Sequence, residues 1–461
     1  MNHIFKLQII PFLFLLVLFF IFSSCTPKVT NPQPDFISPV KQNEQEVPRD
    51  SVKKTEYYKP DFIRYTDHIY SPLIKTLLIH KKGFELTMPV IELGTDEAVF
   101  VSFDDLETVK KNYRYTVVQC DALWQPTKLQ PMEYLDGFTE GYINDYKFSF
   151  NTLQPYIHYS FSFPGENSKV TKSGNYLIKI YLPDNEDKPV ATCRFMVYEN
   201  LVSVAGKVKQ ATLIEDRPYK QEVDFTINKQ GYAISDYYSN LKVILMQNGR
   251  LDNQISSLRP KMVTGDVLDY DYDDINVFYG GNEFRNFDIK SFNYNSERVR
   301  KMKHDSAIYH IYLYDDIKRS FKVYISEDDI NGRRLIKNEE RTDSDIEADY
   351  AKVHFTLPYG NPLLDGSLYI LGALTNWQFL PEAKMNYDFS KKAYTCTLLL
   401  KQGYYNYQYV YVKNSSSSGD ETLVEGNHSV TNNEYFIFVY YRQQGEYYDR
   451  LVGFTQLFSN K

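Results

Sequence analysis

The residues that most readily suggest chemistry are four aspartates in one short run: Asp269, Asp271, Asp273 and Asp274. Closely spaced carboxylates are typical of calcium loops, and an EF-hand loop needs Gly at its sixth position and Glu at its twelfth. In a loop counted from Asp269, those positions hold Asp274 and Gly280. The sequence therefore predicts a solvated acidic loop with Tyr270 and Tyr272 buried, and an irregular calcium site is the alternative.

The other residue types that carry catalysis show no pattern of a reactive centre. Of the eight histidines only His304 and His310 stand close together, and the zinc pattern His-Glu-x-x-His does not occur. The Gly-x-Ser-x-Gly elbow, the phosphate-binding loop and the dinucleotide fingerprint are also missing from the sequence. Glu133 and Asp136 lie among aromatic residues, as glycosidase carboxylates would, but so do most acids in this tyrosine-rich chain. We therefore predict no catalytic residue, no metal and no cofactor.

Trp377 has two interpretations. It ends the series Leu371–Trp377, which, with Glu425–His428, resembles the early-set immunoglobulin-like sandwich shared with glycogen- and starch-binding modules. That resemblance implies that an exposed Trp377 could stack on a sugar face. The alternative is a tryptophan that caps its own sandwich at a strand-to-loop corner.

A second group of candidates follows Gly280-Gly281, a pair that suggests a constrained turn. Its members are Asn282, Glu283, Phe284, Arg285, Asn286, Phe287 and Asp288. One interpretation buries both phenylalanines and pairs Arg285 with Glu283 or with Asp288. The other makes the segment part of a docking face, and both can hold at once.

Strands are the elements expected to position these residues. Aromatics make up 16% of the 461 residues, with 41 Tyr and 30 Phe, and this composition favours pleated, half-buried surfaces. The net charge is -7, whereas a nucleic-acid surface needs a concentrated basic face. We expect an all-β protein that does not bind nucleic acid.

The clearest strand pattern lies between Val117 and Pro164. One strand is predicted to end at Cys120, and Asp136-Gly137 has the composition of a turn. Aromatic residues then alternate with Lys and Ser over 146–150, and a further strand is predicted over 158–163. This spacing is typical of a β-sandwich.

The N-terminal residues 1–24 are predicted to be a targeting segment. Lys6 precedes the apolar run Ile9–Phe22, which is shorter than the about 20 residues that span a bilayer. The small residues before Cys25 resemble a bacterial lipobox, so we predict a lipoprotein signal peptide and a lipidated Cys25. Residues 25–60 are rich in proline and polar residues and are predicted to form a disordered tether.

Three cysteines follow the tether: Cys120, Cys193 and Cys396. Cys120 and Cys193 belong to the same expected domain, so they could form a disulfide, and two buried thiols are the alternative. Cys396 shares a strand face with apolar residues and is predicted to lie in a core.

The chain is too long for a single core, and domains of about 100–150 residues are typical. We predict three consecutive immunoglobulin-like or β-sandwich domains over 61–200, 201–350 and 351–461, the last of them early-set immunoglobulin-like.

Several motifs resemble the type 9 secretion system plug protein family of Bacteroidetes. They are Cys120-Asp-x-x-Trp124-x-Pro126, Tyr134-Leu135-x-Gly137-Phe138, Phe148 to Tyr156, Gly281 to Asp288 and Ile346 to Val353. Within them, the residues expected to bind a partner or determine the fold are Trp124, Tyr134, Leu135, Gly137, Phe138, Asn282, Glu283, Phe284, Arg285, Phe287 and Asp288.

The resemblance implies a non-catalytic subunit of the type 9 secretion system. Such a subunit closes the periplasmic side of the outer-membrane translocon barrel when no cargo is engaged. The expected partners are that barrel and, through Cys25, the lipid of the outer membrane, so that the protein faces the periplasm. The alternative function is that of a glycan-binding outer-membrane lipoprotein that uses Trp377.

Overall fold

The computed structural model describes residues 62–183 and 185–459. The predicted signal segment and lipidated Cys25 lie outside these residues. Within them the chain is built of strands, as predicted, and no helix is long and apolar enough to cross a membrane. The short helical elements are α2 (Pro131–Tyr134), α3 (Ser344–Glu347), α4 (Thr422–Glu425), η1 (Ala373–Thr375) and η2 (Pro381–Ala383).

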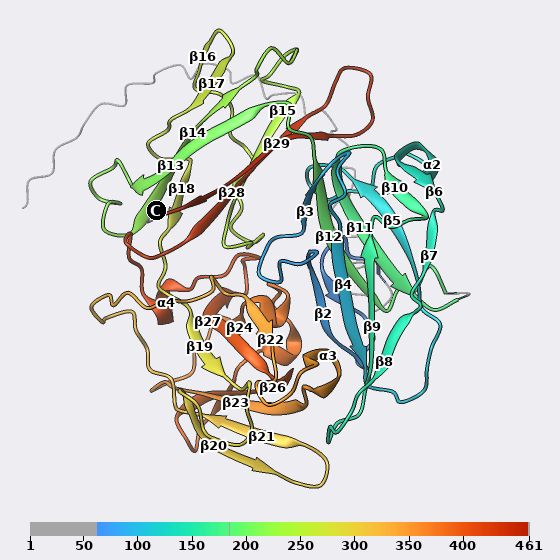
Figure 1. The fold of residues 1–461 in the computed structure, drawn as a ribbon. Helices are drawn as coiled ribbons and strands as arrows, with labels where there is room; N and C mark the ends of the chain where they lie inside the picture. The colour runs from blue at the N-terminus through green and yellow to red at the C-terminus, as the bar shows by residue number, and fades with distance from the viewer. Residues whose placement is uncertain (1–61, 184, 460–461) are drawn as a thin grey trace, which may run out of the picture. The chain divides into compact units, whose positions relative to one another are not determined.

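The first sandwich packs two antiparallel sheets around one core (Figure 1). One sheet has the order β2 (Ile74–Lys81), β4 (Val99–Asp105), β9 (Ile157–Phe163), β8 (Asp145–Phe148). The other has the order β1 (His68–Ile69), β12 (Ala191–Tyr198), β11 (Gly174–Tyr181), β5 (Arg114–Cys120), β7 (Glu140–Tyr142), and β3 (Val90–Glu92) runs parallel to β12.

The strand predicted over 158–163 is present as β9, but Phe148 and Phe150 of the predicted alternation are exposed, and the predicted turn is wrong. Asp136 and Gly137 belong to a strand, β6 (Leu135–Gly137), which pairs with β10 (Ser168–Val170). Gly137 is needed there because its φ is +103° and a Cβ would lie 2.2 Å from the carbonyl oxygen of Asn167. A left-handed glycine signals a turn in the sequence, but here it allows two backbones to approach closely.

The second sandwich takes its strands from two distant parts of the chain. Its first sheet has the order β13 (Ser203–Gln210), β14 (Lys220–Asn228), β17 (Val267–Tyr270), β16 (Met262–Thr264), with β18 (Val277–Tyr279) also paired to β14. Its second sheet has the order β15 (Leu241–Gln247), β28 (Glu434–Tyr441), β29 (Arg450–Phe458). In Figure 1 the red C-terminal strands accordingly lie beside the green ones.

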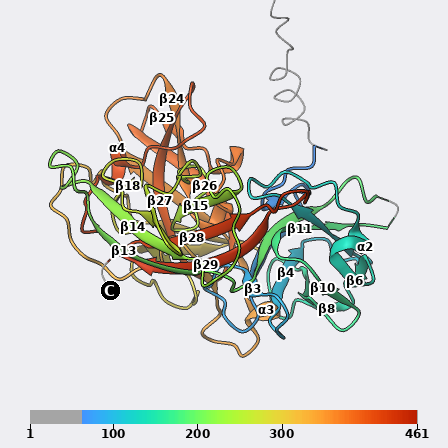
Figure 2. The same cartoon turned by 90° about the horizontal axis from the view of Figure 1, so that it is seen from above.

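This pairing crosses the expected boundary at residue 350, because β15 precedes it and β28 follows it. The residues from Val243 to Met246 of β15 are all apolar because this part of the strand is buried on both faces. Val243 and Leu245 enter the core of the second sandwich, whereas Ile244 and Met246 enter a separate apolar cluster shared with β12. β29 also contacts β12 and β11 of the first sandwich. Figure 2 shows the red β29 running toward β11.

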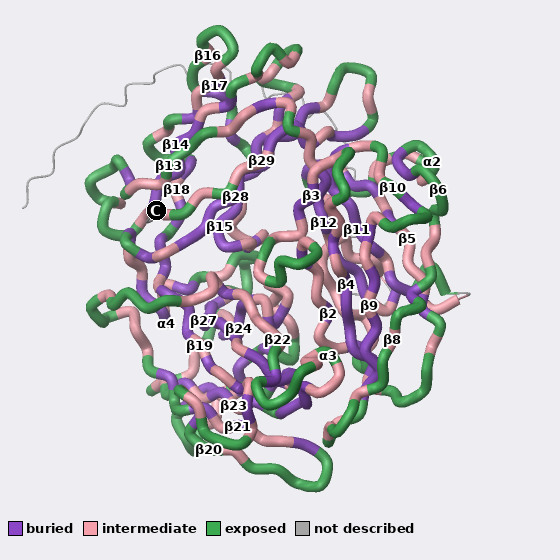
Figure 3. Tube along the Cα trace, in the orientation of Figure 1, coloured by how far each residue is buried: buried purple, intermediate pink, exposed green. Residues whose placement is uncertain are grey.

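The third sandwich occupies the stretch between β18 and β28. One sheet has the order β19 (Arg285–Asp288), β27 (Gly403–Lys413), β22 (Arg334–Ile336), with β24 (Gly366–Leu371) also paired to β27. The other has the order β20 (Val299–His304), β21 (Tyr309–Leu313), β23 (Tyr350–Pro358), β26 (Ala393–Lys401), β25 (Asn386–Asp388). Figure 3 shows buried residues concentrated along these strands and exposed residues at the loops.

Candidate functional site

The opening family motif lies in the first sandwich, partly buried. Trp124 follows β5 in a left-handed conformation (φ 62°), and the Arg194 guanidinium carbon lies 4.8 Å from its ring centroid. Tyr134 is buried and donates its hydroxyl to the carbonyl of Val117 at 2.9 Å. Leu135 is buried beside it, whereas Phe138 is exposed.

Two other family motifs, far apart in sequence, meet at a junction between the first and third sandwiches. Asp349 accepts hydrogen bonds from the amides of Leu153 and Gln154, at 2.5 and 3.1 Å. Tyr156 donates its hydroxyl to the carbonyl of Ala348 at 2.8 Å. The segments 148–156 and 346–353 thus form one contact, which we call the 150–350 junction.

A buried ionic network lies at the same junction. Asp104 of β4 accepts from Lys401 Nζ at 2.7 Å and from the Tyr350 hydroxyl at 2.6 Å, and its other oxygen is 2.7 Å from His158 Nδ1. The Lys401 ammonium also lies 4.2 Å from the ring centroid of Tyr156. Both charges are buried, so the network joins two sandwiches through groups that cannot be solvated once the junction is closed.

The network sets the ionisation of its carboxylate. Burial alone would raise the pKa of Asp104, but the charge of Lys401 and the hydrogen bond of His158 outweigh it and lower that pKa. Asp104 is therefore ionised in the folded protein. Sequence reasoning missed this pair, and the signal for it was a lysine that directly follows Leu398–Leu400 in a buried strand.

Arg285 is the centre of the other family motif, and its predicted partners were wrong. It pairs with Asp316 at 3.0 Å and with Glu425 at 2.9 Å, and all three side chains are buried. Glu283 and Asp288 point elsewhere, and Asp288 pairs with Lys290 at 3.1 Å. The reason is that acids from other segments of the third sandwich reach the buried face of β19.

The remaining residues of this motif are also held by the fold. Phe284 and Phe287 are buried as predicted, with Phe287 stacked on Tyr405 at 5.1 Å. Asn282 donates to the carbonyl of Glu425 at 2.8 Å. These contacts fit the interpretation of the motif as fold-determining.

Glu283 is held differently from its neighbours. It accepts hydrogen bonds from the Tyr324 hydroxyl and from the Asn432 amide, the latter at 3.1 Å, but its Oε2 is buried without a hydrogen-bond partner among the described residues. Burial raises the pKa of Glu283 to about 7. Glu283 is the ionisable group of this motif whose charge changes near neutral pH.

Trp377 is half-buried rather than exposed on a surface. It has a left-handed φ of 56°, and its ring makes an edge contact with Phe284 at 6.0 Å between centroids. Gly332 packs against the same ring, because a Cβ there would lie 2.3 Å from Trp377 Cη2. These neighbours belong to its own sandwich, and this arrangement resembles the capping alternative more than a sugar platform.

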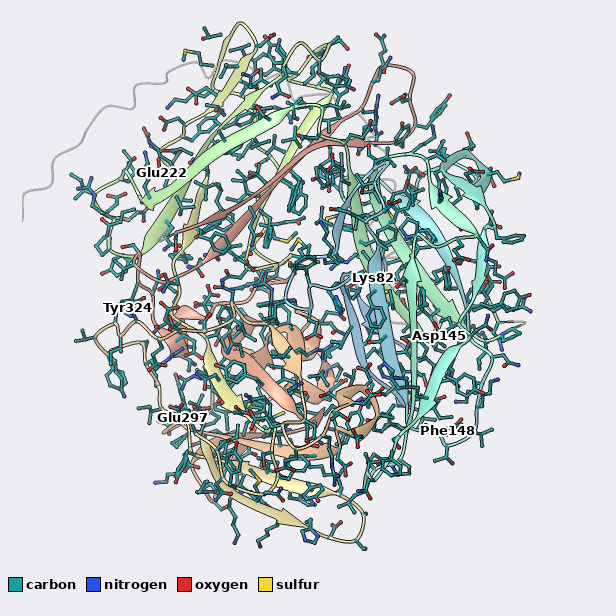
Figure 4. All side chains as sticks on the ribbon, viewed as in Figure 1. Lys82, Asp145, Phe148, Glu222, Glu297 and Tyr324 are labelled. Carbon is teal, nitrogen blue, oxygen red and sulfur yellow. The ribbon has the colours of Figure 1, made fainter. Side chains whose placement is uncertain are left out.

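The acidic run lies partly in a strand and partly in a loop. Tyr270 of β17 is buried, whereas Tyr272 is only half-buried. A carboxylate oxygen of Asp271 lies within 4.8 Å of carboxylate oxygens of Glu222 and Asp224, which belong to β14. Figure 4 labels Glu222 on this strand. Lys209 Nζ already lies 3.1 Å from Glu222 and 2.7 Å from Asp224, so a metal ion would have to compete with this ammonium group.

The cysteines of the described residues are free and buried. Cys120 and Cys193 do not form a disulfide, and Cys396 lies in the core of the third sandwich. Burial raises the pKa of the Cys120 thiol to about 12. All three behave as small apolar residues.

An extended segment of the third sandwich exposes apolar side chains. Phe321, Val323 and Ile325 are 77%, 89% and 69% exposed and alternate along the chain. Tyr324, labelled in Figure 4, points the other way and anchors the segment through Glu283 and the carbonyl of Val430. The backbone of residues 323–326 makes no hydrogen bond within the described part of the chain. We call this stretch the 321–325 segment.

Together, the fold and these contacts define an all-β protein of several sandwiches, in which buried polar networks join one sandwich to the next. Residues 74–199 match the family model described as the type 9 secretion system plug protein 1st domain. Through this first domain the chain belongs to the type 9 secretion system plug protein family. This membership associates it with type 9 secretion and with the cell envelope.

The similarity to solved structures extends far beyond that first domain. A crystal structure of a hypothetical protein from Parabacteroides merdae ATCC 43184 is 36% identical, with a TM-score of 0.84. The match covers 86% of this chain and 100% of that one. The BSP domain of a biofilm associated protein is 9% identical, and the match covers 84% of this chain and 59% of that one. Its TM-score of 0.16 is too low to indicate a shared fold. No curated protein matches.

Proposed function

We propose that the protein is a non-catalytic subunit of the type 9 secretion system. It docks on the periplasmic side of the outer-membrane translocon barrel and seals it when no cargo is engaged. The observation that carries this proposal is the match of the first sandwich to the family's plug domain. In this proposal Cys25 is lipidated and holds the protein at the outer membrane, facing the periplasm.

The buried networks support a mechanical role. A body that blocks a pore must keep its domains in one arrangement, and an ion pair buried between two domains favours the one arrangement in which both charges are paired. The Asp104–Lys401 pair closes the contact between the first and third sandwiches. The Arg250–Glu421 pair at 2.9 Å, also buried, does the same between the second and third.

We propose the 321–325 segment as the surface that docks on the barrel. Within the described residues the backbone of 323–326 makes no hydrogen bond, and the exposed apolar side chains occupy every second position of the segment. An extended segment of this kind can pair with an exposed sheet edge, which supplies main-chain hydrogen bonds and pockets for alternate side chains. Its anchor through Tyr324 keeps the apolar side facing outward.

The test is affinity purification of the full-length protein from native membranes. We expect a very large outer-membrane barrel to co-purify with it, and cells that lack the protein to admit bulky solutes when the translocon is idle. Replacing Phe321, Val323 and Ile325 by Ser should reduce barrel recovery at least tenfold.

The matched control is Phe389→Ser, because Phe389 is 76% exposed on the same sandwich but outside the 321–325 segment. It should leave barrel recovery unchanged. Full recovery with the triple variant would reject this docking surface, while unchanged permeability of cells lacking the protein would reject the sealing role.

A further inference from the structure

A cavity of about 190 Å³ lies where all three sandwiches contribute side chains. Apolar groups form much of its wall, among them Leu77 of the first sandwich and Met246 of the second. Its size is that of a small ligand or a single amino-acid side chain rather than of an extended polymer. Most of the residues that line the cavity lie outside the family motifs.

The only two tryptophans of the chain, Trp124 and Trp377, both line this cavity. They come from different sandwiches, and each has a left-handed φ, 62° and 56°. That conformation is rare for a bulky side chain, and such residues cluster at active sites and ligand clamps. Two aromatic side chains held in a constrained backbone conformation therefore line one cavity.

A cation without a carboxylate partner lines the same cavity. Arg334 Nη2 donates to the carbonyl of Leu77 at 2.5 Å and to Asn376 Oδ1 at 3.3 Å. No ion pair of Arg334 is present within the described residues, whereas Arg194 beside it pairs with Asp67 at 3.0 Å and Arg333 pairs with Glu434.

The pKa shifts of two buried arginines reflect this difference in ion pairing. Burial lowers the pKa of Arg334, whereas in Arg285 the opposing effect of Glu425 and Asp316 outweighs burial and raises the pKa. Glu85 also lines the cavity, but it is exposed to solvent and makes no ion pair among the described residues. Arg334 thus contributes one positive charge to the wall that forms no ion pair within the described residues.

We propose that this cavity binds a small carboxylate with a flat apolar body. Nε and Nη1 of Arg334 make no hydrogen bond within the described residues and are left to donate to a carboxylate, and the single positive charge fits a monoanion. Trp124 and Trp377 pack against the apolar body. The C-terminal residue of a peptide and a free aromatic acid share this chemistry. The proposal does not rest on the proposed docking to a barrel.

The test uses the intrinsic fluorescence of the two tryptophans, since both line the site. Titration of the folded protein with benzoate should give a saturable change, and benzamide, its neutral isostere, should bind at least tenfold more weakly. Arg334→Gln should weaken benzoate binding at least tenfold. Arg300→Gln, a change at an exposed arginine outside the cavity, should not.

A thermal-shift measurement on the unmodified protein covers the case in which Arg334→Gln fails to fold. Benzoate should then raise the Tm and benzamide should not. N-acetylphenylalanine binding more tightly than benzoate assigns the site to a peptide chain end, and the reverse order assigns it to a free aromatic acid. The proposal is overturned by equal effects of benzoate and benzamide, by no saturable change, or by a folded Arg334→Gln variant that binds benzoate normally.

Discussion

The Asp104–Lys401 contact can be removed with a nearly isosteric substitution. Lys401→Met keeps the apolar stem of the side chain and removes the ammonium that lies 2.7 Å from Asp104 Oδ2. Breaking a buried pair by removing one partner costs about 3–5 kcal/mol. We expect the lower end, about 3 kcal/mol, because His158 and Tyr350 still contact the buried carboxylate.

The chain offers a matched control that spans the same two sandwiches. Lys147 pairs with Asp343 at 3.0 Å, but the two side chains are 58% and 36% exposed. Exposed pairs contribute about 0–1 kcal/mol. Lys147→Met should therefore change stability by less than about 1 kcal/mol, although it also removes a lysine from a contact between the first and third sandwiches.

The assay is urea unfolding followed by tryptophan fluorescence, since both tryptophans line the cavity between the sandwiches. A loss of about 3 kcal/mol corresponds to a roughly hundredfold change in the folding equilibrium. Far-ultraviolet circular dichroism should show the strand content of the Lys401→Met variant unchanged before unfolding. Equal urea midpoints for Lys401→Met and Lys147→Met would refute the argument that the Asp104–Lys401 pair matters for stability because it is buried.

The pH dependence gives a second readout of the same contact. The pKa of Asp104 is lowered in the folded protein, so its contribution is present above the ordinary pKa of aspartate, about 3.9, and is lost as the pH falls through the lower folded value. In Lys401→Met we expect the loss of stability in acid to begin at a higher pH.

Two further predictions concern the motif around Arg285. Arg285→Met leaves Asp316 and Glu425 buried with fewer partners and should cost about 3–5 kcal/mol in urea unfolding, whereas Arg300→Met at an exposed pair should cost less than about 1 kcal/mol. The raised pKa of Glu283 means that the folded state binds its proton more tightly than the unfolded state. Stability should therefore fall as pH rises from about 4.5 to about 7, and Glu283→Gln should flatten that part of the stability profile, measured as the urea midpoint across this range. An unchanged profile in Glu283→Gln would contradict the prediction.

Local patterns in the sequence predicted the strands well. β9 alternates buried and partly buried positions over its C-terminal half, and β5 ends at Cys120 as expected. The all-β class follows from these patterns and from the aromatic composition. Pairing between distant strands was not predictable, since nothing in the sequence near β15 specifies that its neighbour is β28.

The same limit explains the errors at the site. The predicted partners of Arg285 were its nearest acids in sequence. Asp288 lies three positions along β19 and therefore on the opposite face, Glu283 lies before the strand begins, and the buried face meets acids from other segments. The burial of Phe284 and Phe287 was predicted because it depends on hydrophobicity alone. Whether Trp124 and Trp377 share a cavity depends on how three sandwiches pack, which no local pattern encodes. That the segments bounded at residues 200 and 350 fold as separate units stays a prediction.

The sheet formed by β15, β28 and β29 has a consequence for biosynthesis. A ribosome delivers β13 to β18 long before residues 434–458 leave it, and two of the three strands of that sheet come from this last segment. N-terminal domains generally fold first during synthesis. The first sandwich can therefore mature on the emerging chain, while the middle one has to wait, with the apolar faces of β15 uncovered, until translation is almost finished. A premature stop that removes only the last few dozen residues would thus damage the middle of the protein more than its end.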